Sequence, residues 1–282
     1  GSLSGLLRVR SLAINDAHIY CSAEQLKEEL KATIKMTLDY YNLFRFENIK
    51  VRISLHDPKN TEKFLPHPEL WAHSEGIVSE VVKELALEHF IGIGEAAFYG
   101  PKIDFQAQTG LGREETISTT QLDFGGPLRF NLTYVGEDGK EHRPYIVHRA
   151  PLSTHERFFA FLIEHLGGAF PTWMSPVQAL IIPVGDTFEA YAKEIQELLR
   201  SELFRVEIDA SANSFNKRIR EGVTRKIPNI VVVGGRESEQ RTITLRRYVD
   251  SKQVSMPLDA FMARMEKLRK QRIMDNFPDV EV

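Results

Sequence analysis

The pattern of apolar residues changes near residue 175, and this change limits the chain to two domains of different construction. Before that point, helical stretches are interspersed with alternating strands that follow one another directly, which is typical of an α+β domain with an antiparallel sheet. After it, short apolar strands alternate with helices, which is typical of a small α/β domain with a mixed sheet. A chain of 282 residues has room for about two domains. We therefore expect domains over residues 1–175 and 176–282.

Local signals predict the main elements of the first domain. Ser22 and Gln25 have the spacing of a capping box, and the apolar residues after them predict a helix to about residue 44. Further helical spacing covers 74–90, whereas alternation predicts an all-β stretch over 102–135. A second capping box, beginning at Ser153, predicts another helix. The first segment, 5–21, is expected to form strands and a turn, and 137–140 a hairpin turn.

Composition excludes several classes of protein. Hydrophobic residues make up 42% of the chain and charged residues 27%, so the chain can bury a core. It has no run of about 20 apolar residues that could span a membrane, and we expect no signal peptide. The single cysteine, Cys21, excludes an intramolecular disulfide and a Cys-only zinc cluster, which fits a reducing compartment. A net charge of −3 means that any nucleic-acid contact would use a local basic face.

The residues that could carry chemistry are scattered, and taken alone each has two interpretations. His18 and His148 are metal ligands or ordinary hydrogen-bonded histidines. Lys102 follows a tight turn, and either meets an anion or belongs to a loop that enters a strand. Arg157 is expected in the first turn of a helix, where the helix dipole disfavours a cation, so it either lies in solvent or binds an anion. Arg8 either clamps a phosphate or pairs with nearby acids.

Nine short strings, taken in order, resemble the threonyl-tRNA synthetases. They are GLLRVR (5–10), DAHI (16–19), AFYGPKI (97–103), TTQLDF (119–124), YVGED (134–138), HRA (148–150), ERF (156–158), FPTW (170–173) and PVQ (176–178). The similarity runs over essentially the whole chain. It implies a class II synthetase core on an antiparallel sheet, incomplete at its N-terminus, followed by an α/β anticodon-binding domain. It also implies that ATP with Mg2+ activates threonine to threonyl-adenylate, from which the threonyl group passes to tRNA(Thr).

The resemblance further implies roles for residues at matching positions. It implies catalytic roles for Arg8, Lys102 and Arg157, and ATP binding by Arg8, Thr119, Gln121 and Arg157. It implies threonine binding by Asp16, Tyr99 and Lys102, and zinc binding by His18 and His148. In the second domain it implies anticodon binding by Glu237 and Arg246. The third zinc ligand, a cysteine, is not expected in this chain. Zn2+ that binds the amino and hydroxyl groups of threonine would reject valine, because a site built for a hydroxyl discriminates strongly against its absence.

Other positions depart from the family, notably Ile14, Glu115 and Thr116. We therefore keep a second hypothesis, a synthetase-like paralogue that binds tRNA or an adenylate without aminoacylation, and a third, a class II enzyme for another amino acid. The family implies a cytoplasmic homodimer with no membrane partner. These 282 residues alone are not expected to aminoacylate.

Overall fold

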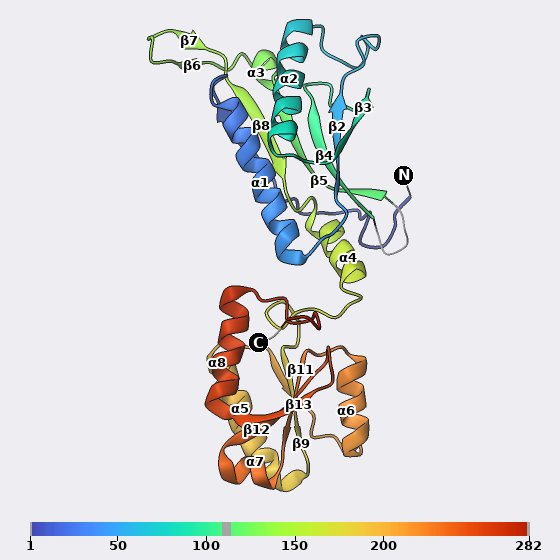
Figure 1. The fold of residues 1–282 in the computed structure, drawn as a ribbon, viewed down its shortest axis with the longest axis vertical. Helices are drawn as coiled ribbons and strands as arrows, with labels where there is room; N and C mark the ends of the chain where they lie inside the picture. Colours follow the sequence, from blue (N-terminus) through green and yellow to red (C-terminus); the bar gives the residue numbers. More distant parts are fainter. Residues whose placement is uncertain (1, 109–113, 281–282) are drawn as a thin grey trace. The chain divides into compact units, whose positions relative to one another are not determined.

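The computed structural model describes residues 2–108 and 114–280. They form two compact units, Gly1–His165 and Leu166–Val282 (Figure 1). The division falls between His165 and Leu166, whereas the sequence pattern changes near residue 175. The segment between these points packs with the second unit.

The first unit is built on a six-stranded sheet in the order β1-β8-β5-β4-β2-β3. Its strands are β1 (Ala17–Cys21), β2 (Lys50–Leu55), β3 (His89–Ile93), β4 (Lys102–Gln108), β5 (Glu114–Asp123) and β8 (Tyr145–Ala150). Neighbouring strands are antiparallel except β2 and β3, which are parallel. A separate hairpin joins β6 (Tyr134–Val135) to β7 (Glu141–His142), and Gly139 takes a φ of 71° in its turn, as the sequence predicts.

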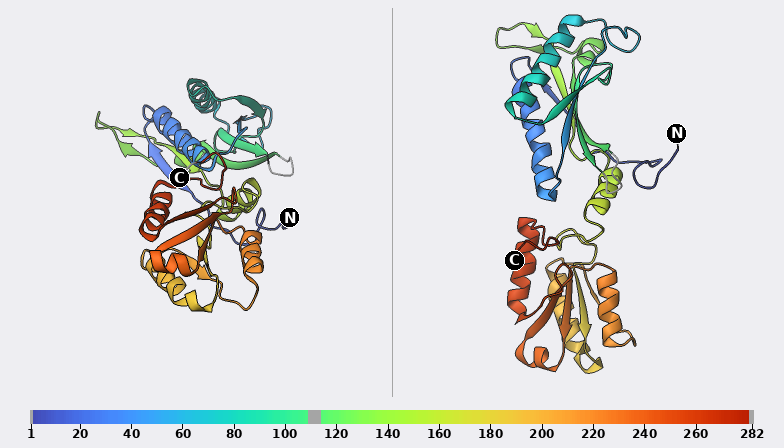
Figure 2. Two further views of the ribbon diagram at one scale, coloured as in Figure 1. Left: turned by 60° about the horizontal axis from the view of Figure 1, so that its bottom comes forward. Right: turned by 45° about the vertical axis from the view of Figure 1, so that its right-hand side comes forward.

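Helices cover one face of this sheet and leave the other face polar. The helices of the unit are α1 (Leu26–Phe44), α2 (Pro68–Glu84), α3 (Gly125–Arg129) and α4 (His155–His165). α1 and α2 lie together on one face (Figure 2), where Ile53, Ile103 and Leu122 are fully buried among their apolar side chains. Since successive strand residues point to opposite faces, the polar residues between these positions project from the other face.

The first capping box is confirmed and the second is wrong. The Gln25 amide donates to Ser22 Oγ at 3.3 Å, and the Ser22 amide donates to Gln25 Oε1 at 3.0 Å. At α4, Thr154 is the residue that caps the helix, since its Oγ1 accepts from the Arg157 amide at 3.2 Å. Ser153 lies one residue too early and takes a left-handed φ of 51°.

Two other expectations for the first unit are wrong in their boundaries. The helix expected over 74–90 is α2, which begins earlier because Pro68 suits a first helical turn, and ends before Ala86, whose φ is 51°. Residues 89–90 belong to β3 instead. The stretch 102–135 is not all β, because Asp123 Oδ1 accepts from the Gly126 amide at 2.7 Å at the start of α3. In the first segment, residues 4–8 form only an isolated bridge, and regular strand begins at Ala17.

The second unit has the mixed α/β architecture that the sequence predicts. Its sheet has five strands in the order β10-β9-β11-β12-β13. The elements are β9 (Ala179–Pro183), the 3-10 turn η1 (Asp186–Phe188), α5 (Glu189–Ser201), β10 (Val206–Ile208), α6 (Phe215–Thr224), β11 (Asn229–Val233), α7 (Gly235–Gln240), β12 (Thr242–Arg247), β13 (Gln253–Pro257) and α8 (Leu258–Gln271). β10, β9 and β11 are parallel, whereas β12 and β13 are antiparallel. Helices cover both faces of this sheet, because neighbouring residues of β9 point to opposite faces. Ile181 packs with α5 and α8, whereas Leu180 packs with α6.

A buried polar network ties the entry of the second unit to its C-terminal segment. The amide and Oγ1 of Thr172 donate to the two carboxylate oxygens of Asp275 at 2.7 and 2.6 Å. Asn229 Nδ2 donates to Thr172 Oγ1 at 2.7 Å, and Gln178 Nε2 to the Thr172 carbonyl at 2.9 Å. All four side chains are buried. Separately, no helix in the described part of the chain has the length and apolar character needed to cross a membrane.

Candidate active site

One row of side chains crosses the polar face of the six-stranded sheet. His18 on β1 is the register partner of His148 on β8, and His148 is opposite Gln121 on β5. Gln121 is opposite Lys102 on β4, which is opposite Ser54 on β2. Directly opposed residues of antiparallel strands project to the same face, so all five side chains share it. The structure therefore brings together four residues that are far apart in the sequence and were predicted as site residues.

The two histidines form the end of this row. Their ring centroids are 4.1 Å apart, with an angle of 69° between the rings. His148 Nε2 lies 3.0 Å from Oδ2 of the buried Asp123, and His18 Nδ1 lies 3.8 Å from Asp16 Oδ2. Each imidazole thus has one ring nitrogen beside a carboxylate.

Tyr99 closes over the middle of the row. Its ring stacks on His148 with centroids 5.5 Å apart, and its hydroxyl donates a hydrogen bond to Gln121 Oε1. Burial, followed by the negative charges of Asp123 and Asp16, raises the pKa of the Tyr99 phenol, so that it stays a donor at neutral pH. The next residue, Gly100, is required here, since a Cβ atom would lie 1.9 Å from the Leu122 carbonyl oxygen.

Lys102 is held in place by a buried carboxylate. Asp104 is 1% exposed and accepts from Lys102 Nζ at 2.9 Å, Ser54 Oγ at 2.7 Å and Arg52 Nη2 at 2.9 Å. Burial works to raise the pKa of Asp104, but the Lys102 ammonium and these hydrogen bonds outweigh it and lower the pKa below its usual range. The result is a fixed ammonium group on the polar face.

Two more predicted residues lie on β5 and α4. Thr119 precedes Gln121 by two positions and so shares its face, and its Oγ1 is buried with no partner among the described residues. Arg157 lies in the first turn of α4, as the sequence predicts. Its Nη2 is 2.5 Å from Glu115 Oε2 on β5, whereas its Nε is buried and has no partner within residues 2–108 and 114–280.

Among residues 2–108 and 114–280, Arg8 has no hydrogen bond or ion pair with the residues of the row, and its backbone pairs with Ser4 instead. Its backbone bonds Ser4 in both directions at 3.1 Å, and the residue is exposed. In the part of the chain that the structure describes, its side chain makes no hydrogen bond or ion pair.

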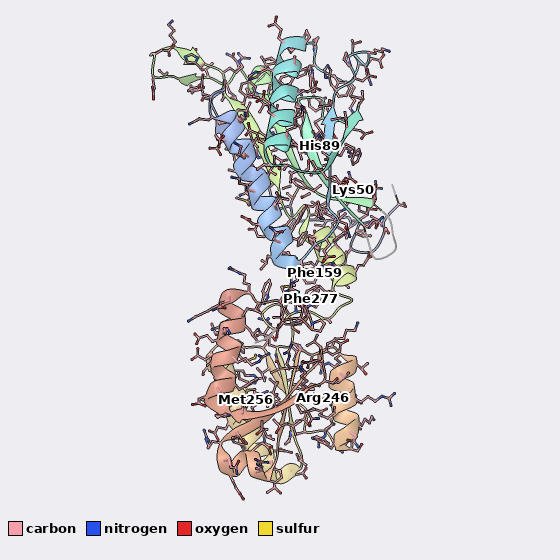
Figure 3. All side chains as sticks on the ribbon, viewed as in Figure 1. Lys50, His89, Phe159, Arg246, Met256 and Phe277 are labelled. Atoms are coloured by element: carbon pink, nitrogen blue, oxygen red, sulfur yellow. The ribbon has the colours of Figure 1, made fainter. Side chains whose placement is uncertain are left out.

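The two residues predicted to contact the anticodon belong to the second unit. Glu237 lies in the first turn of α7, where its Oε2 accepts from the Gly234 amide at 3.0 Å and its Oε1 from Thr244 Oγ1 at 2.9 Å. Arg246 lies on β12 (Figure 3), and its Nε is buried without a partner in the described residues.

Comparisons with known proteins identify the family of the chain. A family model for the tRNA synthetase class II core domain (G, H, P, S and T) matches residues 1–166. The chain belongs to the class II tRNA synthetases. A second model, for an anticodon binding domain, matches residues 178–268 of this synthetase chain. The expected fold class, a class II core followed by an anticodon-binding domain, is therefore confirmed.

The relatives also bear out the resemblance to threonyl-tRNA synthetases. The threonine–tRNA ligase of Staphylococcus saprophyticus is 46% identical over 276 residues, which cover 96% of this chain and 43% of that protein. The one of Geobacillus kaustophilus is 45% identical over 274 residues, covering 96% and 42%. A solved RNA binding domain of threonyl-tRNA synthetase from Cryptosporidium parvum is 34% identical, with a TM-score of 0.87 over 94% of this chain and 66% of that one. The chain spans about 43% of the length of such curated relatives.

Two histidines of the synthetase core, His18 and His148, have the chemistry of zinc ligands. Catalytic zinc sites use three protein ligands and keep one position open. Among the described residues, no group of three or more His, Cys, Asp or Glu could hold a metal ion. His18 and His148 nevertheless fit, because each has a carboxylate beside one ring nitrogen, which is how ligating histidines are commonly oriented.

Three residues of the site were not predicted from the sequence as members of it: Asp104, Glu115 and Asp123. Alternation could have found Asp104 and Asp123, since each lies two positions from a predicted residue on the same strand. No local pattern connects Glu115 with Arg157 across the 42 positions between them.

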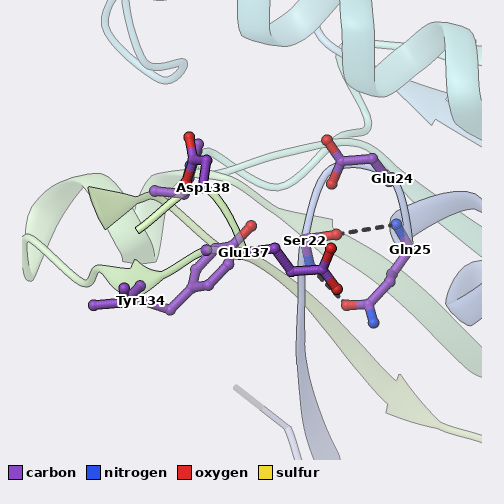
Figure 4. A pocket seen from close by; sticks show the side chains of 9 residues that line it. Ser22, Glu24, Gln25, Tyr134, Glu137 and Asp138 are labelled. Atoms are coloured by element: carbon purple, nitrogen blue, oxygen red, sulfur yellow. Dashed lines mark hydrogen bonds and ion pairs between the residues drawn. The ribbon is translucent and has the colours of Figure 1, made fainter. Parts of the chain in front are cut away.

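Several cavities lie in the described part of the synthetase core. One of about 500 Å³ is bounded by Tyr99 and Asp123, so it adjoins the row, and its other walls are mainly apolar. Another, of about 570 Å³, lies between the start of α1 and the β6–β7 hairpin (Figure 4). Carboxylates of Glu24, Glu137 and Asp138 line this second cavity, and none of the predicted site residues does.

Proposed function

We propose that the chain carries the amino-acid-activating and anticodon-recognising parts of a threonine–tRNA ligase. The observation that supports this most is the row that places His18, His148, Gln121 and Lys102 on one polar face. In the first step, the threonine carboxylate attacks the α-phosphorus of ATP and pyrophosphate leaves. In the second, a ribose hydroxyl at the end of tRNA(Thr) attacks the threonyl carbonyl and AMP leaves.

The histidine end of the row would hold the amino acid. His18 and His148 would bind Zn2+ together with a cysteine that these 282 residues do not supply. When bound, the ion supplies a Lewis acid for the amino and hydroxyl groups of threonine. Asp16 would accept the hydroxyl proton in a hydrogen bond, and Tyr99 would close the pocket. A valine side chain would leave these polar groups unpaired and be rejected.

The other predicted residues would hold ATP with its Mg2+. Little general acid or base chemistry is needed in this reaction, so the protein contributes positioning and stabilisation of charge on the phosphates. Lys102 would offer its fixed ammonium to the reacting groups, and Arg8 and Arg157 would bind phosphate oxygens. Thr119 and Gln121 would complete the nucleotide site, and the unpartnered Thr119 Oγ1 supports this role.

In the second unit, Glu237 and Arg246 would read anticodon bases. The buried, unpartnered Nε of Arg246 supports a role as a donor to a ligand. Since Glu237 already accepts two hydrogen bonds from its own unit, its backbone and carboxylate position are fixed before any tRNA binds. We place the intact protein in the cytoplasm, as a homodimer, by its family alone. We place the domain boundary near residue 175, because the pattern of strands and helices in the sequence changes there.

One observation favours a second function, a paralogue that binds tRNA or an adenylate without charging tRNA. Glu115 neutralises Arg157, the residue expected to bind the ATP phosphates. A carboxylate in that position opposes the binding of a polyphosphate, whereas tRNA binding through the second unit does not depend on it.

The deciding experiment is threonine-dependent ATP–pyrophosphate exchange by the natural protein, with bound zinc measured on the same sample. Exchange with about one zinc per chain supports the ligase, and titration with threonine, serine and valine tests the amino acid. A preference for valine would contradict the zinc–hydroxyl account. Specific, salt-sensitive tRNA binding without exchange in a folded, zinc-loaded protein would instead support the paralogue.

A further inference from the structure

In the synthetase core, the carboxylate of Glu115 binds Arg157, the residue that the proposed function assigns to phosphate binding. Glu115 Oε2 lies 2.5 Å from Arg157 Nη2, and the two side chains are 34% and 33% exposed. A hydrogen bond between a guanidinium and a carboxylate is charge-assisted and stronger than one between neutral groups. The contact places a negative charge directly beside the cation of the site.

The position of Glu115 on the guanidinium of Arg157 affects how a phosphate can bind there. A guanidinium binds a phosphate bidentately either through Nη1 and Nη2 or through Nε and Nη2. Both arrangements use Nη2, the atom bound to Glu115, but each uses a different one of its two N–H groups. The buried Nε has no partner among the described residues, so a donor of the second arrangement remains available. While Glu115 holds Nη2 on one edge, a phosphate group that binds the other edge of Arg157 lies close to the Glu115 carboxylate.

The backbone on both sides of this pair is fixed. Glu115 lies on β5 opposite Ala107, just beyond the bulge between Phe105 and Gln106. Arg157 lies in a helical turn whose amide is bonded to Thr154 Oγ1. An anion that binds Arg157 therefore lies near the carboxylate of Glu115, which repels it.

We propose that Glu115 is the internal counter-ion of Arg157 and lowers the affinity of this site for the phosphate tail of ATP. The proposal rests on the proposed role of Arg157 in phosphate binding. It makes Glu115 a residue that determines affinity for the nucleotide without being required for the chemistry. Replacing the carboxylate by an amide of the same shape removes the competing charge and keeps the packing.

Isothermal titration of the natural protein and its Glu115→Gln variant, with ATP and with inorganic tripolyphosphate, tests this proposal. We expect Glu115→Gln to bind both anions roughly tenfold more tightly, since a like charge near the bound phosphate is removed. Glu114→Gln is the matched control, because Glu114 is the adjacent residue on β5 and pairs with Lys50 at 3.2 Å. It should leave both affinities unchanged. Unchanged or weaker binding by Glu115→Gln would overturn the proposal.

Further variants separate this proposal from the function on which it rests. Arg157→Gln should weaken tripolyphosphate binding, and adding Glu115→Gln to it should give a smaller gain than it gives in the natural protein, since only the repulsion is relieved. If Arg157→Gln binds as the natural protein does, the phosphate role of Arg157 fails, and with it the counter-ion. If Arg157→Gln weakens binding but Glu115→Gln does not tighten it, the counter-ion alone fails.

Kinetics distinguish a counter-ion from a merely structural residue. In exchange assays, Glu115→Gln should lower the KM for ATP and leave the KM for threonine unchanged, whereas a disturbed fold would change both. Glu115→Asp keeps the charge and should restore the weak ATP binding. A Glu115→Asp variant that binds ATP as tightly as Glu115→Gln would contradict a role for the charge.

Discussion

His148 and the start of α3 are joined through one side chain, that of Asp123. Its Oδ2 lies 3.0 Å from His148 Nε2, while its Oδ1 accepts a hydrogen bond from the Gly126 amide at 2.7 Å. The ring of His148 is thereby fixed to the backbone of a neighbouring element. Such a contact selects the tautomer of the imidazole and leaves its other nitrogen for a ligand.

Asp123→Asn should weaken zinc binding by about 10- to 100-fold, because the carboxylate that orients His148 is lost. Competition with a chromogenic chelator measures this affinity directly. Asp138→Asn is the matched control, since Asp138 pairs with His142 at 2.8 Å in the β6–β7 hairpin, away from the row. Equal zinc affinity in both variants would mean that Asp123 does not position a zinc ligand.

Asp104→Asn should destabilise the first unit by about 3 kcal/mol, because Arg52 and Lys102 lose the buried carboxylate that pairs with them. Urea unfolding at neutral pH measures this. Glu28→Gln, which removes an exposed partner of Lys31, should have no measurable effect.

The lowered pKa of Asp104 predicts that its contribution to stability depends on pH. Because the pKa of Asp104 is lower in the folded protein than its ordinary value of 3.8, its stabilisation is fully present above that pH. It is lost as the pH falls through the folded-state pKa, when the carboxylate takes up a proton. The difference in stability between the natural protein and Asp104→Asn should therefore shrink below about pH 4. A constant difference down to pH 2 would contradict this account.

Ser153→Gly should stabilise the first unit by up to about 1 kcal/mol, because a left-handed φ is unfavourable for residues with a Cβ atom. Ser153→Val should do the opposite, since a β-branched side chain tolerates this conformation least. The midpoints of urea unfolding of the two variants should move in opposite directions. If they move together, the left-handed conformation at residue 153 is not present in solution.

Asp275→Ala should destabilise the second unit by about 3 kcal/mol, because the buried amide and hydroxyl of Thr172 lose their acceptor. The two tryptophans allow each unit to be followed separately, since Trp71 belongs to the first and Trp173 to the second. In 5-fluorotryptophan-labelled protein, the fluorine resonance of Trp173 should shift to its unfolded position at lower urea. A simultaneous, equal change at Trp71 would show that the two units unfold together.

The sequence predicts elements well where a local signal decides them. The Ser22–Gln25 capping box and the hairpin turn at Gly139 both form as their residue types require. Prediction from sequence fails where apolar spacing continues past the end of an element. Leu85 and Leu87 extend the helical pattern of α2, yet the left-handed Ala86 ends the helix before β3.

Prediction of the site has a similar limit. The resemblance supplied His18, His148, Gln121 and Lys102, and strand pairing explains why they meet. Sequence alone does not give the Arg157–Glu115 contact, because it depends on where α4 packs against β5. Contacts between side chains on separate elements are decided by tertiary packing, which no local pattern encodes.

The row across the sheet limits how this protein can evolve. The residues of the row are aligned by the pairing of each strand with the next, from β1 to β2. One inserted or deleted residue in β8, for example, would turn His148 towards the helices and Val147 towards the polar face. Selection can therefore exchange the side chains of this site one at a time, whereas changes in strand length are confined to the turns that connect them.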